Sequence, residues 1–405
     1  MNYNLNIPIR TNMTPGPVEA DPRVLRVMSA PILGQFDPEF LKLMDETMEL
    51  ARYLFKTENK WAYAIDGTAR AGIEAVLASI IEKGDKVLVP IFGRFGHLLS
   101  EIAKRCGAEV IEMEKEWGKV FEYQEVKEKI EEVKPKIVAM IHGETSTGRL
   151  QPIREIGKFC RDNNILFVVD CVATIGGVEF SVDDYNIDAA IAGSQKCISV
   201  PTGMALVTYN SRVEKILQER KKVEQGLGGN IDNPRFIQSN YLDLSQIQDY
   251  WSEKRLNHHT EATTMLYAMH EGLRIIKEEG LEERIRRHNY HEKAIVIGIK
   301  AMGLEIYGDM ESKMPTVTCV CIPEGVNGDA VRATMLQQFG VEIASSFGTL
   351  NGKIWRIGNM GYSSKKENVL HVLMALEASI VRHGGKVNLG QGVQAALKYY
   401  EEVEY

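Results

Sequence analysis

The sequence predicts an α/β protein that has a large domain with a mainly parallel sheet and a smaller C-terminal α/β domain. Short apolar runs alternate with helical patterns between about residues 60 and 210, and a second alternation of this kind follows residue 262. Strands that alternate with helices indicate βαβ units and a sheet covered by helices on both faces. The length of 405 residues suits a large unit plus a smaller one and is ample for a sizeable core.

The large domain is expected to span residues 21–262, after an N-terminal arm of residues 1–20. Apolar residues recur at helical spacing in four segments of its sequence: 68–85, 94–107, 124–134 and 153–163. Short apolar runs predict buried strands at 86–91, 108–114, 136–144, 165–172, 189–193 and 204–210. In an open α/β sheet, ligands bind at the carboxyl ends of the strands.

The small domain is expected to span residues 263–405 and to begin with a long helical segment at 263–303. Four short apolar runs then predict strands: LEIYG, TVTCVCIP, VEIASS and WRIGNMG. Helical patterns at GDAVRATMLQQFG and KENVLHVLMALEASIVRHGG alternate with them, and the chain closes on the amphipathic segment NLGQGVQAALKYYEEVEY. This alternation predicts a second α/β unit.

Composition argues against several classes of protein. The net charge of −7 disfavours non-specific binding to nucleic acid. No run of about 18 apolar residues could span a membrane, and the N-terminus lacks the apolar centre of a signal peptide. The six cysteines are scattered without a CxxC pair, which favours free thiols in a reducing cytoplasm over a disulfide framework, although spacing alone does not exclude a bridge.

Lys196 is the only charged residue in the apolar segment 189–210. A lysine in a loop usually extends its ammonium group to the surface, and this is the simpler interpretation. The alternative is a lysine held in apolar surroundings, where desolvation lowers the pKa and frees the amine as a nucleophile. Lysines of that kind form Schiff bases with carbonyl compounds.

Asp170 stands at the end of the apolar strand ILFVVD, where a carboxylate is costly without a cationic partner. It could cap the next turn, or it could pair with a protonated pyridine nitrogen and so keep a cofactor ring protonated. The segment DGTARAGIEA, at 66–75, opens a helix with small residues, and a helix N-terminus suits a phosphate. Neither a P-loop nor a GxGxxG fingerprint is present. A helix N-terminus suited to a phosphate, a carboxylate at a strand end and an isolated lysine together favour pyridoxal 5'-phosphate as the cofactor.

A family resemblance covers nearly the whole chain. In order, DGTARAGIEA, HGETSTG (142–148), VVDCVATIGG (168–177), GSQK (193–196), NHHT (257–260) and WRIG (355–358) resemble the motifs of class V aminotransferases, which have the pyridoxal-phosphate-dependent transferase fold of type I. The pattern is most similar to the alanine–glyoxylate and serine–pyruvate branch. The resemblance implies a homodimer whose subunits share their active sites, with small-molecule substrates.

The resemblance also implies roles for individual residues. Lys196 would be the Schiff-base lysine and then the acid–base for proton transfer, and Asp170 would pair with the pyridine nitrogen. Phe95 would stack on the ring, where many relatives carry tryptophan, and Val172 would pack against the opposite face. Thr145 would contact the ring hydroxyl. The phosphate would be bound by Thr68, Ala69, Arg70, Gln195 and the partner's Thr260. Relatives often have Gly-His in place of Ala69-Arg70.

Substrate binding is implied for Arg356, Asn257 and Gln35. Arg356 would bind the substrate α-carboxylate through two hydrogen bonds. Without the family resemblance, its local sequence predicts an arginine on the surface of a strand. Asn257 stands where the alanine–glyoxylate branch has tyrosine, and Gln35, in ILGQFDPEF, stands where it tends to have serine. Amides offer both donors and an acceptor, which complement a ureido group. Neutral drift at the rim of the site is the alternative.

This combination resembles aminotransferases of purine (allantoin) catabolism that act on (S)-ureidoglycine. The implied reaction converts (S)-ureidoglycine to oxalurate and passes its amino group to glyoxylate, which becomes glycine. A generalist alanine– or serine–glyoxylate aminotransferase is the main alternative. A class V lyase such as a cysteine desulfurase would need a mobile cysteine, whereas Cys319 and Cys321 lie in an apolar strand. A non-enzymatic protein that kept the fold is a further alternative, which Lys196, Asp170 and Arg356 argue against.

Two adjacent histidines, His258 and His259, raise the question of a metal site. Adjacent side chains on a helix or strand point away from one another, so they rarely bind one ion. With no nearby cysteine or carboxylate to complete a ligand set, we expect no metal there. The histidines are expected instead to form structural hydrogen bonds near the subunit interface.

Overall fold

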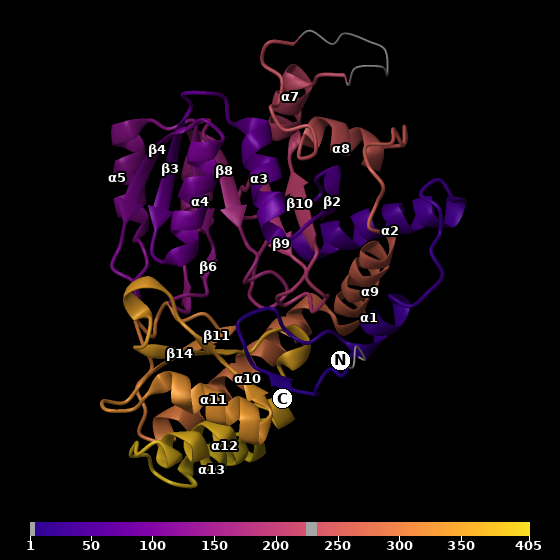
Figure 1. Ribbon diagram of the computed structural model, residues 1–405. Coiled ribbons are helices and arrows are strands. Elements are labelled where there is room, and N and C mark those ends of the chain that lie inside the picture. Colours follow the sequence, from indigo (N-terminus) through magenta and orange to yellow (C-terminus); the bar gives the residue numbers. More distant parts are fainter. Residues whose placement is uncertain (1–4, 224–232) are drawn as a thin grey trace.

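A computed structural model of the chain describes residues 5–223 and 233–405. It has a large α/β layer structure at one end and a smaller α/β unit at the other (Figure 1). The large sheet has seven strands, in the spatial order β2 (Trp61–Asp66), β10 (Met204–Tyr209), β9 (Ala189–Gly193), β8 (Leu166–Asp170), β5 (Ile137–Ile141), β3 (Lys86–Ile91) and β4 (Glu109–Glu114). Only β10 runs antiparallel to its neighbours, so the expected mainly parallel sheet is confirmed.

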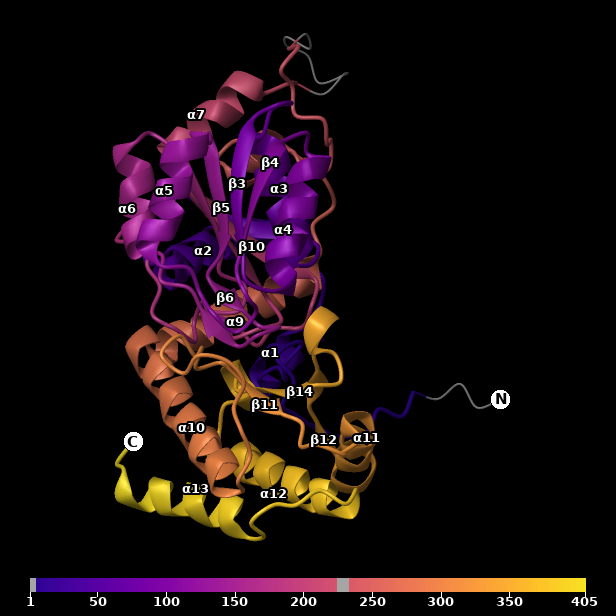
Figure 2. The ribbon, with the colours of Figure 1, turned by 90° about the vertical axis from the view of Figure 1, so that its left-hand side faces the viewer.

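Helices cover both faces of this sheet. Figure 2 shows α3 (Ala69–Ile80) and α4 (Arg94–Arg105) on one face, with α5 (Tyr123–Val133) and α6 (Arg154–Asp162) on the other. The central strands β5, β8, β9 and β10 are buried along their whole length, as expected for apolar runs between two helical layers. The parallel strands run toward the small unit, so their carboxyl ends face it (Figure 1).

Most of the elements expected from the sequence form within one to five residues of their predicted ends, and β3 and β9 match completely. The long helical segment at 263–303 is divided in two, α9 (Thr263–Glu279) and α10 (Leu281–Ala301), because Gly280 adopts a φ of +85°. The expected strand LEIYG forms only an isolated bridge, between Ile306 and Val320. Among the described residues, the longer elements without a counterpart in the prediction are α1 (Pro22–Val27), α2 (Pro38–Phe55), β2, α7 (Ser211–Arg220) and α8 (Leu244–Trp251).

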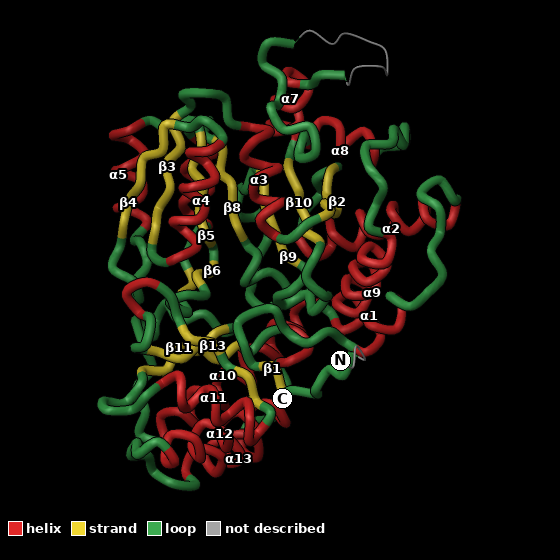
Figure 3. The backbone as a smooth tube through the Cα atoms, viewed as in Figure 1, coloured by secondary structure: helices red, strands yellow, loops and turns green. Residues whose placement is uncertain are grey.

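The smaller unit is built on a three-stranded antiparallel sheet. Its strands are β11 (Val317–Cys321), β14 (Ile354–Gly358) and β13 (Ala344–Ser345), and its helices are α10, α11 (Gly328–Phe339), α12 (Lys366–Arg382) and α13 (Gln391–Glu402) (Figure 3). The N-terminal arm joins this unit, because β1 (Thr11–Asn12) pairs with β12 (Val341–Glu342) and Met13 lies in its core. The apolar residues of α9 pack into the core of the large unit.

Two further expectations concern the chain as a whole. Among the described residues, no helix is long and apolar enough to cross a membrane. All six cysteines are free thiols in the structure, and four of them are buried.

Candidate active site

Nine of the residues selected from the sequence line one cavity of about 240 Å³ at the carboxyl edge of the large sheet. Three of them come from strand ends or just beyond: Asp170 ends β8, Lys196 follows β9 by three residues, and Thr68 follows β2 and is the N-cap of α3. The others are Ala69, Arg70, Phe95, Thr145, Val172 and Gln195. The sheet topology therefore brings together residues that are up to 128 positions apart (196 − 68).

Lys196 is a lysine in a desolvated environment. Burial lowers the pKa of its ammonium group to about 8, and the positive charge of Arg356 acts in the same direction. Its Nζ donates a hydrogen bond to the carbonyl oxygen of Pro15, which belongs to the N-terminal arm. The amine is thus close to neutral at moderately alkaline pH, as a nucleophilic lysine requires.

Asp170 is 8% exposed, and its Oδ1 accepts a hydrogen bond of 2.9 Å from the backbone N–H of Val172. Burial raises the pKa of this carboxyl to about 7, and the nearby Glu144 adds to the rise. The sequence interpretation that Asp170 caps the next turn is therefore correct, but this single bond does not offset the desolvation. A cationic partner would favour the ionised form.

Glu144 is a site residue that the sequence reasoning missed, although it lies in the quoted motif HGETSTG. Its carboxylate is fully buried and accepts hydrogen bonds from the backbone N–H groups of Phe95, at 2.8 Å, and Ser146, at 3.0 Å. The Ser146 hydroxyl donates a further bond of 2.6 Å to the same carboxylate. Burial raises the pKa of Glu144. This carboxylate holds the start of α4, and with it Phe95, against the cavity; a charged residue inside an apolar run was the signal for it.

Arg356 lies in β14 of the small unit and is 6% exposed, so the expectation of a surface arginine from its position alone is wrong. Its Nε donates to the carbonyl oxygen of Ser345 at 2.7 Å, and one Nη donates to that of Thr145 at 3.1 Å. Among the described residues, no carboxylate lies within ion-pair distance of its guanidinium group. A buried guanidinium beside Thr145 and Lys196 suits a carboxylate-bearing ligand.

Three of the selected residues do not line the cavity of their own chain. Asn257 and Thr260 are exposed, on the segment between α8 and α9. Gln35 lies before α2, and its Nε2 donates a hydrogen bond of 2.9 Å to Oδ1 of Asn257. The two amides selected for their chemistry are thus in direct contact, 222 residues apart in sequence.

The adjacent histidines do form hydrogen bonds, as expected, with 2.8 Å between the Nδ1 atoms of His258 and His259. The premise that no carboxylate lies nearby is wrong. Asp66, from the end of β2, and Glu261 both face Nε2 of His259. Asp66 is remote in sequence, whereas Glu261 is only two positions away and could have been noticed.

Comparison with known proteins agrees with this geometry. Residues 29–356 match the family described as aminotransferase class-V. The chain belongs to the class-V aminotransferase family. It is similar to (S)-ureidoglycine–glyoxylate transaminase of Bacillus subtilis, with 62% identity over 97% of this chain and 96% of the relative. It is also similar to alanine–glyoxylate aminotransferase of Drosophila melanogaster, with 35% identity over 93% of each chain.

Among solved structures, this class-V aminotransferase resembles the ureidoglycine–glyoxylate aminotransferase of Bacillus subtilis. The TM-score is 0.94, with 61% identity over 98% of this chain and all of that one. The α/β architecture deduced from the sequence and the resemblance to class V aminotransferases are both confirmed.

Proposed function

We propose that this class-V aminotransferase transfers the amino group of (S)-ureidoglycine to glyoxylate, with oxalurate and glycine as products. The observation that carries the proposal is the cavity that unites Lys196 and Asp170 and has Arg356 beside it. The 62% identical relative bears the name of this reaction, and the contact between Gln35 and Asn257 supplies a pair of amides suited to a ureido group.

The residues of the cavity fit pyridoxal 5'-phosphate as the cofactor. Thr68 makes no side-chain cap at the start of α3, so the hydroxyl and the first N–H groups of that helix are available to a phosphate. Gln195 and Arg70 also line the cavity. Asp170 gains a cationic partner if a protonated pyridine nitrogen faces it, which offsets the cost of its burial. When bound, this cofactor supplies an electron sink for negative charge at the substrate Cα.

Each of the other residues has a defined task. Thr68, Ala69, Arg70 and Gln195 bind the phosphate, and Thr145 contacts the ring hydroxyl. Phe95 and Val172 pack against the two faces of the ring, and Glu144 keeps Phe95 in place through its backbone N–H. Lys196 would carry a proton to and from the substrate Cα, a task that suits an amine whose pKa is near 8.

Arg356 binds the α-carboxylate that both substrates carry. Its bonds to Ser345 and Thr145 hold the guanidinium plane, which limits the rotamer entropy lost on binding. Because the two substrates use the same arginine in turn, one cavity can serve both half-reactions.

The active enzyme is proposed to be a homodimer with two-fold symmetry. Asn257 and Thr260 are exposed and lie outside the cavity of their own chain. In a dimer they would enter the partner's cavity, where Thr260 contacts the phosphate and Asn257, with Gln35, binds the ureido group.

Alanine– or serine–glyoxylate aminotransferase activity is the second candidate, since the same cavity would serve it and 35% identical relatives carry the alanine–glyoxylate name. A cysteine-based lyase is disfavoured by the structure. Cys319 is fully buried in β11, and burial raises the pKa of its thiol to about 11, so it cannot act as a mobile sulfur acceptor.

The half-reactions separate these functions. The visible absorbance of the cofactor-loaded enzyme is followed after addition of (S)-ureidoglycine, alanine or serine alone. We expect (S)-ureidoglycine to convert the cofactor fastest; equal rates with alanine would overturn the substrate assignment.

A pair of variants tests the amides directly. Asn257→Ala should lower kcat/KM for (S)-ureidoglycine by about tenfold to a hundredfold, as expected for one lost bond to a buried polar group, and should spare alanine. Gln394→Ala, which removes an exposed amide on α13, is the matched control. An equal loss with both donors would mean that Asn257 supports the fold of the site and does not select the substrate.

A further inference from the structure

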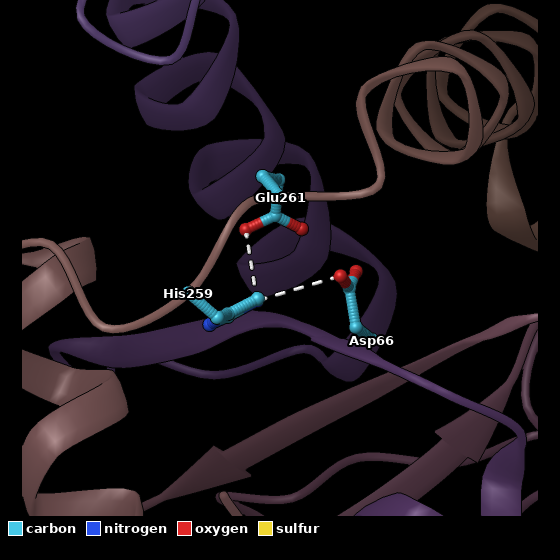
Figure 4. Close-up of side chains that lie close together, drawn as sticks. All are labelled: Asp66, His259 and Glu261. Carbon is cyan, nitrogen blue, oxygen red and sulfur yellow. Dashed lines mark ion pairs between the residues drawn. The ribbon is translucent and has the colours of Figure 1, made fainter.

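Asp66, His259 and Glu261 form a buried cluster outside the cavity described above. Nε2 of His259 lies 3.4 Å from Oδ2 of Asp66 and 3.7 Å from Oε2 of Glu261. One atom from each residue can be chosen so that all three lie within 4.8 Å of one another. Figure 4 shows the three side chains pointing toward one another, with Asp66 from the end of β2 and the other two from the segment before α9.

The carboxylate of Glu261 is buried beside the ring of His259 and the carboxylate of Asp66. Its side chain is 1% exposed, and among the described residues neither of its oxygens accepts a hydrogen bond. Asp66 uses only Oδ2, which accepts from the backbone N–H of Ala262 at 3.0 Å. Two largely buried carboxylates this close are stabilised by a positive charge or by a shared proton between them.

The hydrogen bonds of the histidines present a lone pair to this position. Nε2 of His258 faces the carbonyl oxygen of Asn240 at 3.1 Å, which only a protonated Nε2 can satisfy. In neutral His258, Nδ1 is then an acceptor, so Nδ1 of His259 is the donor across the 2.8 Å contact. In this tautomer, His259 directs the lone pair of Nε2 at the two carboxylates. A second hydrogen bond that fixes the ring in this way is typical of metal-ligating histidines.

We propose that Asp66, His259 and Glu261 bind a divalent transition-metal ion, with Zn²⁺ as the best match to one imidazole and two carboxylates. Ligand atoms about 2.1 Å from a tetrahedral Zn²⁺ are separated by roughly 3.4 Å, close to the 3.4 and 3.7 Å observed. The ion neutralises both carboxylates and takes up the lone pair of His259. The competing arrangement is a proton in place of the metal, either on His259 or shared by the two carboxylates.

The position of the site gives the ion a structural task. Asp66 directly precedes Gly67 and Thr68, where the phosphate-binding start of α3 begins, while His259 and Glu261 flank Thr260. A bound ion ties the end of β2 to the segment that carries Asn257 and Thr260. Binding of the ion itself does not depend on which substrate the enzyme uses.

The test measures metal binding to the cofactor-loaded enzyme after removal of metals with a chelator. Equilibrium dialysis against Zn²⁺, followed by elemental analysis, should give one tight site per chain. Glu261→Gln keeps the shape of the side chain and should weaken this site at least about tenfold. His270→Gln is the matched control, because His270 pairs with Glu46 at 3.0 Å on the surface and should leave binding unchanged.

Co²⁺ provides a second readout that needs no variant. Co²⁺ added to the metal-free enzyme should produce the intense visible bands of a low-coordinate ion, and Zn²⁺ should abolish them. Equal Zn²⁺ binding by Glu261→Gln and the unmodified enzyme would overturn the proposal. So would the absence of both Zn²⁺ binding and Co²⁺ bands, which would mean that a proton within the cluster takes the place of the metal.

Discussion

Replacement of Lys196 by methionine should stabilise the cofactor-free protein while abolishing transamination. The ammonium group of Lys196 is held in a desolvated cavity next to the positive charge of Arg356, so its charged form is disfavoured in the folded state. Methionine has similar length and no charge, and therefore removes this penalty. The effect is an example of a functional group that costs stability at its site.

The magnitude follows from the pKa of Lys196. Its pKa falls from an ordinary value of 10.5 to about 8, and each pKa unit corresponds to about 1.36 kcal/mol. The gain in unfolding free energy is thus at most about 3 kcal/mol. Because the group is a base whose pKa is lowered on folding, the penalty is complete below pH 8 and fades as the pH rises toward 10.5. The stabilisation by Lys196→Met should therefore be largest at neutral pH and shrink in alkaline solution.

Chemical denaturation of the cofactor-free proteins measures this difference across a series of pH values. Lys386→Met, at an exposed lysine, is the matched control and should not shift the transition. The reasoning is refuted if Lys196→Met unfolds at the same denaturant concentration as the unmodified protein at pH 7. It is equally refuted if the gain does not decrease between pH 8 and pH 10.5.

Two further predictions concern residues beside the cavity. Arg356→Gln should raise KM about tenfold to a hundredfold for both (S)-ureidoglycine and glyoxylate, because a hydrogen bond between the guanidinium and the shared carboxylate contributes about 1.5–3 kcal/mol. Steady-state kinetics with each substrate varied in turn measures both KM values. A rise in KM for only one substrate would contradict the shared role. Glu144→Gln should lower the unfolding free energy by about 1–3 kcal/mol and weaken cofactor binding, since the amide turns an NH₂ group toward the N–H groups of Phe95 and Ser146. An unchanged denaturation midpoint and cofactor affinity would show that Glu144 is protonated in the folded protein.

Strands and helices with a strong local signal could be predicted well from the sequence. The β3 and β9 runs are apolar throughout because both faces of the sheet are covered, so their bounds follow from composition. The long pattern at 263–303 could not reveal its break, because glycine is tolerated inside helices and Gly280 ends this one only through its positive φ. Strand β2 was missed although Trp61–Asp66 is almost entirely buried, since it begins and ends among polar residues.

The sequence by itself determined which residues line the cavity. Lys196, Asp170 and the start of α3 each stand at a strand end or helix start, and parallel strands deliver such positions to one edge of the sheet. The position of each of these residues can be recognised locally, because the apolar run before it is long enough to identify the strand that it follows.

Only the tertiary structure decided which remote residues meet. The bond between Gln35 and Asn257 joins two loops, and the cluster of Asp66, His259 and Glu261 joins a strand end to a loop almost 200 residues later. Burial of Arg356 likewise depends on how β14 faces Thr145 across the two units. No periodicity encodes such contacts, because they arise from the packing of loops whose paths depend on the whole fold.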